Sequence, residues 1–186
     1  MTAIELLPLG NADRQLVRAL RSPLMETFQA QVAIREMDVD LEQFCDTERI
    51  QYNSTDILNH MQRVGPNGSH AQAGSPVPAS RRLAVVSEDL FVPILTFVFG
   101  EAQLGGDVAV VSYHRLQNER YGLARNPDLL FDRLLKEAVH ELGHAYGLVH
   151  CSTQECVMHT STYVEDIDLK SSSFCTACSD AILNHL

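Results

Sequence analysis

The residues between positions 140 and 150 have the types and spacing of a catalytic metal site. They read H-E-x-x-H-x-x-G-x-x-H, and the fixed positions are His140, Glu141, His144, Gly147 and His150. On a helix, His140 and His144 project from one face, one turn apart. Gly147 can adopt the left-handed conformation that ends a helix, which turns the chain and returns His150 to the same ion. Because three protein ligands leave one position for water, the segment predicts a catalytic zinc ion.

Glu141 follows the first histidine and points about 100° around the helix from it. That direction does not suit a ligand, but it brings the carboxylate within reach of a metal-bound water. The pattern therefore predicts hydrolysis in which a zinc-polarised water attacks an acyl carbon. Glu141 would be the catalytic base that accepts the proton and passes one to the leaving amine. A glutamate that is merely solvated on the helix surface is the alternative.

Four cysteines follow this segment in two close pairs. They are Cys151, Cys156, Cys175 and Cys178, and the second pair forms a C-x-x-C. Two such pairs with an intervening loop predict a tetrahedral zinc site of four thiolates, which is closed by its ligands and therefore structural. Two disulfides or a redox-active C-x-x-C are the alternatives. Cys45 is left over, and its neighbours indicate only a half-buried thiol.

Met158 completes the pattern, eight residues after His150. A methionine in a tight turn below a three-histidine zinc provides an apolar floor for the imidazoles. With H-E-x-x-H-x-x-G-x-x-H-C-x-x-x-x-C-x-M followed by C-x-x-C, the chain closely resembles the archaemetzincins, a metzincin-like family. The motif covers residues 140–178, and the runs 98–102 and 110–116 also look like that family.

The resemblance implies an α+β fold of the α/β type, with a metzincin-like twisted mixed sheet backed by helices. It also implies a zinc-stabilised, irregular C-terminal subdomain. All 186 residues would form a single metallopeptidase domain, in which residues 1–147 hold the sheet and the zinc helix and residues 148–186 form the subdomain.

The same resemblance implies a zinc-dependent metallopeptidase with two zinc ions per chain and a peptide or protein substrate. One zinc would be catalytic and the other structural. A two-zinc module that binds peptides or protein termini with little turnover is the alternative. Hydrolysis of a non-peptide amide is a third possibility, because the same chemistry would support it.

Composition limits the class of protein and its partners. The chain has 186 residues, 45% of them hydrophobic, which suits one globular domain. Its formal net charge of −10 argues against a nucleic-acid partner. There is neither an apolar run of membrane-spanning length nor a signal peptide at the N-terminus. With four zinc-type cysteines, these features predict a reducing cytoplasm and no membrane partner. We expect a monomer.

Apolar periodicity and capping signals predict the elements that position the site. Strands are expected at residues 3–8, 28–35, 82–86, 94–99 and 108–112. Helices are expected at residues 11–21, 53–63, 126–146 and 174–186, with Pro23 blocking the first. Gly105-Gly106 predicts an antiparallel return between the last two strands. Residues 65–80 are expected to form a loop and candidate flap. In the architecture that the resemblance implies, strand order makes residues 94–99 the edge strand along the cleft, although their apolar run fits a buried strand equally well.

Three further side chains lie after the metal motif. Tyr163 and Lys170 could reach the cleft and assist the reaction, although surface roles are favoured for both. His159, next to Met158, is a candidate spare ligand or substrate contact, but most loop histidines are neither.

Overall fold

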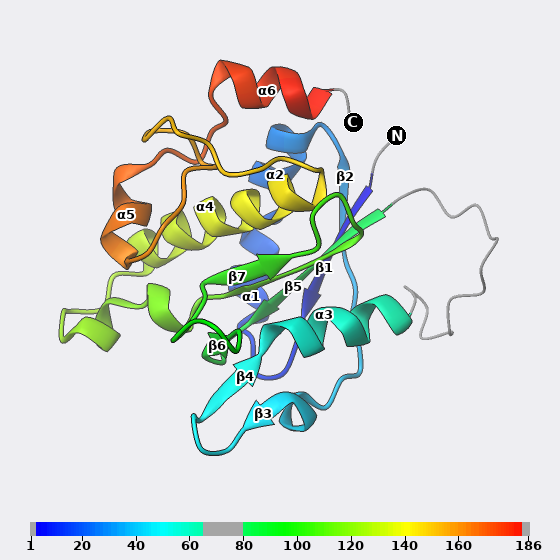
Figure 1. Ribbon diagram of the computed structural model, residues 1–186, viewed down its shortest axis with the longest axis vertical. Helices are drawn as coiled ribbons and strands as arrows, with labels where there is room; N and C mark the ends of the chain where they lie inside the picture. Colours follow the sequence, from blue (N-terminus) through cyan, green and yellow to red (C-terminus); the bar gives the residue numbers. More distant parts are fainter. Residues whose placement is uncertain (1–2, 65–79, 184–186) are drawn as a thin grey trace.

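The computed structural model describes residues 3–64 and 80–183 and contains a five-stranded sheet with helices on both faces (Figure 1). Its strand order is β2-β1-β5-β8-β7. The strands are β1 (Ala3–Pro8), β2 (Gln31–Ile34), β5 (Ser80–Val86), β7 (Gly100–Ala102) and β8 (Val108–Ser112). The first four in the order run parallel, and β7 pairs antiparallel with β8. The predicted mixed sheet is confirmed, and the antiparallel return at Gly105-Gly106 is found, but it joins β7 to β8 rather than residues 94–99 to β8.

Two apolar cores lie on the two faces of this sheet. The helices that cover it are α1 (Arg14–Ala19), α2 (Arg21–Phe28), α3 (Ser54–Arg63) and α4 (Pro127–Ala145). Leu83 and Val85 of β5 belong to the core with α1, α2 and α4. Ala84 and Val86, which point to the opposite face, belong to the core with α3. The period of two along a strand produces this division, and burial on both faces explains the continuous apolar run.

Helix α4 carries the metal motif through the larger core. The Asn126 side chain accepts a hydrogen bond from the Leu129 N–H at 3.1 Å, and Pro127 occupies the first helical position. The helix ends at Ala145, and Gly147 then has a φ of +93°. The predicted helix and the predicted left-handed turn are therefore confirmed.

A second, three-stranded sheet lies beside α3 and was not predicted. Its strands are β3 (Cys45–Asp46), β4 (Gln51–Asn53) and β6 (Leu90–Phe91), and a short 3-10 helix (Leu41–Phe44) precedes it. Strands of two or three residues are too short to show a period-two pattern. The chain between β8 and α4 holds two further 3-10 helices, at His114–Leu116 and Asn118–Tyr121.

The C-terminal part packs along α4, away from the sheet (Figure 1). Up to residue 183, where the description ends, it contains two short helices, α5 (Val164–Leu169) and α6 (Thr176–Leu183), and is otherwise irregular, as predicted. Among the described residues, no helix has the length and apolar character needed to cross a membrane. The predicted flap at 65–80 lies outside the described residues, except for Ser80.

Several predicted boundaries differ from the structure. The first helix ends before Pro23, as predicted, but a second helix follows at once. Pro23 lies in the first turn of α2, where a missing N–H needs no helical partner. As a result, α2 continues to Phe28 and the strand after it is shorter than expected. Asp13, rather than Asn11, caps α1. Residues 94–99 do not form the edge strand, which is β7.

Candidate active site

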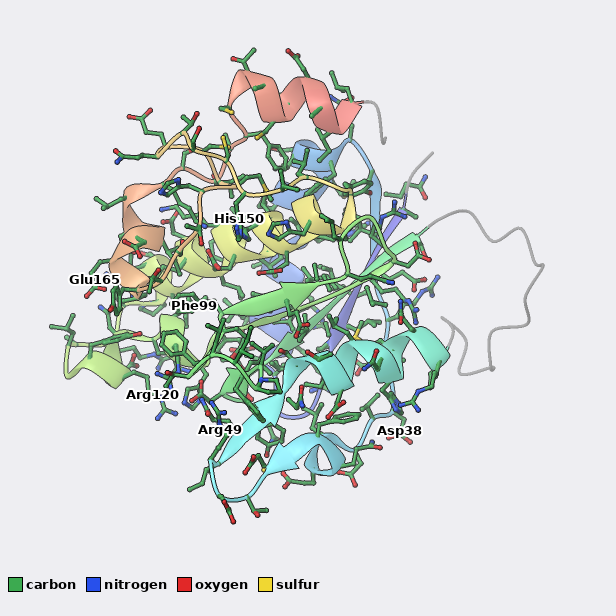
Figure 2. All side chains as sticks on the ribbon, in the orientation of Figure 1. Asp38, Arg49, Phe99, Arg120, His150 and Glu165 are labelled. Atoms are coloured by element: carbon green, nitrogen blue, oxygen red, sulfur yellow. The ribbon has the colours of Figure 1, made fainter. Side chains whose placement is uncertain are left out.

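Three histidines converge where α4 ends. Each of His140, His144 and His150 offers a ring nitrogen, and these nitrogens all lie within 4.8 Å of one another. The Nε2 atoms of His140 and His144 are 3.1 Å apart. Two nitrogens on a tetrahedral zinc, each about 2.0–2.1 Å from the ion, would be about 3.3 Å apart, so the donor set fits zinc. Figure 2 shows His150 beside α4.

Backbone carbonyls orient the two helical histidines. The Nδ1 of His140 lies 2.8 Å from the Val157 carbonyl, and that of His144 lies 2.7 Å from the Leu148 carbonyl. A hydrogen bond from Nδ1–H leaves Nε2 as the metal-facing nitrogen. Burial lowers the pKa of His140 well below its usual value and also lowers the pKa of His144. Both effects favour the neutral imidazole, which is the form that binds a metal.

Glu141 is buried and lines the same cleft. Burial raises its pKa well above the usual value, and the nearby charge of Glu137 raises it further. There is no room for a side chain at position 100, beneath Glu141. A Cβ at Gly100 would lie 2.6 Å from the Glu141 Cγ and 2.7 Å from the Val110 carbonyl oxygen. Gly100 therefore lets β7 approach the carboxylate closely.

Met158 lies fully buried against α4. A Cβ at Gly143 would overlap the Met158 sulfur and approach the Phe174 ring to 3.4 Å. Gly143 thus makes room for the methionine beside His144. The sequence predicts no specific role for Gly100 or Gly143, because a glycine inside an element can mark a close approach without showing which side chain makes it.

The four cysteines form a second cluster. One sulfur from each lies within 4.8 Å of the others, and Cys151 Sγ is 3.8 Å from Cys175 Sγ. Tetrahedral zinc with Zn–S bonds of about 2.3 Å would place its sulfurs about 3.8 Å apart. All four cysteines are free thiols. The sulfurs of Cys151 and Cys175 are too far apart for a disulfide, since an S–S bond is about 2.05 Å long.

Backbone N–H groups favour thiolates at two of these cysteines. A backbone hydrogen bond with Cys178 lowers the pKa of Cys175 to about 7, and one with Thr153 lowers that of Cys151. Burial raises the pKa of Cys156 and Cys178. A thiolate is the form that binds zinc, and a bound cation would favour it at all four positions.

A cleft of about 730 Å³ contains the histidine cluster. Its walls are formed by residues 95–102 and Leu104 on one side, and by α4, Val149 and residues 160–162 on the other. Strand β7 follows one wall as the edge of the sheet. Among the described residues that line this cleft, none is a lysine or an arginine.

The segment 92–99 pairs with a strand only at its end, where Val98 bridges to Leu90, and side chains hold the rest. Arg49 donates to the carbonyls of Leu95 and Thr96, both at 2.9 Å, and Gln51 donates to Thr96 at 3.0 Å. The Arg115 guanidinium lies 4.1 Å from the Phe97 ring centre. These contacts come from residues far away in sequence, so local patterning could not distinguish this segment from a strand.

Lys170 is wholly buried, contrary to the predicted surface role. It is 2% exposed, and its Nζ lies 2.9 Å from Glu137 Oε1 and 3.2 Å from the His159 carbonyl. Glu137 lies one turn before Glu141 on α4 and lines the cleft. Tyr163 is exposed and lies outside the cleft lining, and His159 makes its ring contact with the Cys151 carbonyl.

Replacing Lys170 with methionine should destabilise the protein strongly, because it leaves Glu137 as a buried charge without its partner. We expect the free energy of unfolding to fall by about 3–5 kcal/mol. The double variant Lys170→Met/Glu137→Leu should recover most of that loss. Arg14→Met, which breaks the exposed pair with Glu36, should cost about 1 kcal/mol or less. Denaturant unfolding of the wild type and the three variants measures these losses of stability. Equal losses for Lys170→Met and Arg14→Met would contradict a buried ion pair.

Comparison with known proteins gives a consistent result. Residues 31–184 match peptidase family M54. The archaemetzincin of Methanocaldococcus jannaschii is 35% identical over 171 residues, which cover 92% of this chain and 87% of that protein. The crystal structure of archaemetzincin from Archaeoglobus fulgidus, complexed with malonate, has a TM-score of 0.78 and 36% identity and covers 96% of this chain and 99% of that one. A zinc-dependent peptidase from Methanocorpusculum labreanum has a TM-score of 0.84 and 29% identity, with the same coverage. The chain therefore belongs to peptidase family M54, the zinc metallopeptidases that include the archaemetzincins.

Proposed function

We propose that this protein hydrolyses peptide bonds, with zinc held by His140, His144 and His150 and with Glu141 as the catalytic base. The observation that supports this most is the convergence of three ring nitrogens within 4.8 Å of one another in a cleft that Glu141 also lines. Membership of a peptidase family makes a peptide or protein the substrate class.

Each part of the cleft has a task in this reaction. Zinc held by His140, His144 and His150 would lower the pKa of a water and polarise the substrate carbonyl. Glu141 takes a proton from the water that attacks the acyl carbon and passes it to the leaving amine as the C–N bond breaks. Strand β7, as the edge of the sheet, offers backbone N–H and C=O groups along the cleft to an extended peptide. Met158 and the carbonyls of Val157 and Leu148 hold the imidazoles in place.

A second zinc ion, in this proposal, is held by Cys151, Cys156, Cys175 and Cys178 and is structural. Four thiolates fill a tetrahedral site and leave no position for water. The irregular segment 148–183 has only two short helices, so a metal crosslink would contribute directly to its folding. We also propose that this segment and residues 1–147 are the two subdomains of a single metallopeptidase domain.

The test is peptide cleavage combined with metal analysis. Protein purified under reducing conditions should contain close to two zinc equivalents and should cleave members of a peptide library. A weak chelator should remove the histidine-held zinc first, because its open position admits a competing ligand, and cleavage should stop and return when zinc is restored. Tight peptide binding without cleavage by the zinc-loaded protein would favour the alternative of a binding module. One equivalent of zinc together with oxidised cysteines would contradict the four-thiolate site.

A further inference from the structure

Two apolar side chains beside the histidine cluster have no part in the chemistry proposed above. Leu104 and Val149 both line the cleft, and they are 60% and 65% exposed. Single exposed apolar residues are common on protein surfaces and need no explanation. Together with Leu95, which is 51% exposed, three such residues line one cleft, which indicates a surface that a ligand covers.

One backbone carbonyl anchors the segments that carry these two side chains. The His144 carbonyl accepts a hydrogen bond from the Gly105 N–H at 2.9 Å and another from the Gly147 N–H at 2.8 Å. Leu104 immediately precedes Gly105, and Val149 follows Gly147 by two residues. Both side chains therefore project from backbone that is tied to the same end of α4, where the candidate metal ligands lie.

The charges of the cleft determine which side chains this wall accepts. The acidic residues that line it are Glu101, Glu137 and Glu141, and neither lysine nor arginine is among the described lining. Glu137 is paired with the buried Lys170. Glu101 accepts hydrogen bonds from the hydroxyls of Ser54 and Thr55. An acidic substrate side chain would find carboxylates and apolar surface here and no lysine or arginine to pair with, while the proposed zinc would face the scissile carbonyl.

We propose that Leu104 and Val149 form an apolar subsite that selects peptides with a large apolar side chain next to the bond to be cleaved and rejects acidic ones at that position. This inference rests on the proposed peptidase function and defines its substrate class. Covering the two side chains removes apolar surface from water, which favours leucine in this position, whereas glutamate loses hydration without gaining a partner.

The experiment uses fluorogenic peptides that differ in one residue beside the scissile bond, on one side or the other. The residue is leucine, glutamine or glutamate. For one of the two sides, kcat/KM should be at least about tenfold higher with leucine than with glutamate. Leu104→Lys should reduce that ratio by about tenfold or more, because it adds a cation for glutamate to pair with. The control is Leu123→Lys, since Leu123 is 59% exposed and lies outside the cleft lining.

A second measurement separates this inference from the proposed function. Binding of the same peptides to the zinc-loaded Glu141→Gln variant, followed by fluorescence anisotropy, reports selectivity without turnover. Equal cleavage of all peptides, or an unchanged ratio in both Leu104→Lys and Val149→Lys, would overturn the subsite while the peptidase assignment stands. No cleavage by the wild type, together with preferred binding of the leucine peptide, would support the subsite and reject the peptidase activity. Neither cleavage nor preferred binding would reject both.

Discussion

Replacing Glu141 with glutamine should lower kcat by about 10²–10⁴-fold while leaving zinc and fold in place. Glutamine has nearly the shape of glutamate, so it can occupy the buried space beside Gly100 that the carboxylate fills. Glutamine cannot accept and return a proton. Because this proton transfer contributes only in the transition state, its loss should lower kcat. Steady-state kinetics on a cleaved peptide measure the loss, and metal analysis and thermal melting of the same preparation report on the site and the fold.

A matched control uses Glu165, an exposed glutamate on α5 that does not line the cleft. Glu165→Gln should leave kcat and KM at their wild-type values. If Glu141→Gln lost zinc along with activity, Glu141 would be acting in metal binding rather than in proton transfer. If it kept full activity, another group would have to be the base, and Glu137, one turn earlier on α4, would be the residue to test next.

The candidate metal ligands could be identified from the sequence because their spacing is itself the signal. All seven lie in the segment from His140 to Cys178, and the helix that Asn126 caps places the first two on one face. The resemblance to the archaemetzincins, which rests on the same segment, is confirmed. The geometry brings each set of ligands together, whereas the occupancy, the roles of the two metals, the monomeric state and the cellular compartment stay predictions.

Residues that act through long-range packing were not predictable in this way. Lys170 is a long polar side chain in a loop, and a surface role follows from its type alone. Its burial depends on Glu137, which is 33 positions earlier on another element, so the pair exists only in three dimensions. Gly143 and Gly100 likewise become informative only when Met158 and Glu141 are seen to fill the space above them.

The edge of the cleft shows the same limit. Residues 94–99 have the apolar run of a strand, and the prediction placed the substrate-binding edge there. Their backbone is satisfied in part by Arg49 and Gln51, which belong to the small sheet that the sequence pattern did not reveal. The true edge strand, β7, has only three residues, too few for a pattern of period two.

The second large effect should appear when the cysteine cluster is broken. His150 and Cys151 are consecutive, so one short segment contributes to both clusters. The Cys151 N–H donates to the Met158 carbonyl at 2.9 Å. The carbonyl of Val157, between Cys156 and Met158, receives the hydrogen bond that orients His140. A metal held by the cysteines would therefore fix the backbone that positions two of the three histidines and the methionine below them.

On this argument, Cys178→Ser should weaken zinc binding at the histidines by about 10–100-fold and lower the melting temperature, although Cys178 belongs to the other cluster. Competition with a chelator of known affinity measures the first effect, and calorimetry the second. His144→Ala should lose the histidine-held zinc and keep the cysteine-held one, because the support runs from the cysteines to the histidines. Cys45→Ser, outside both clusters, is the control and should change neither. If Cys178→Ser kept full zinc affinity at the histidines and its melting temperature, the cysteine cluster would not support the active site, and its purpose would have to lie in the C-terminal segment alone.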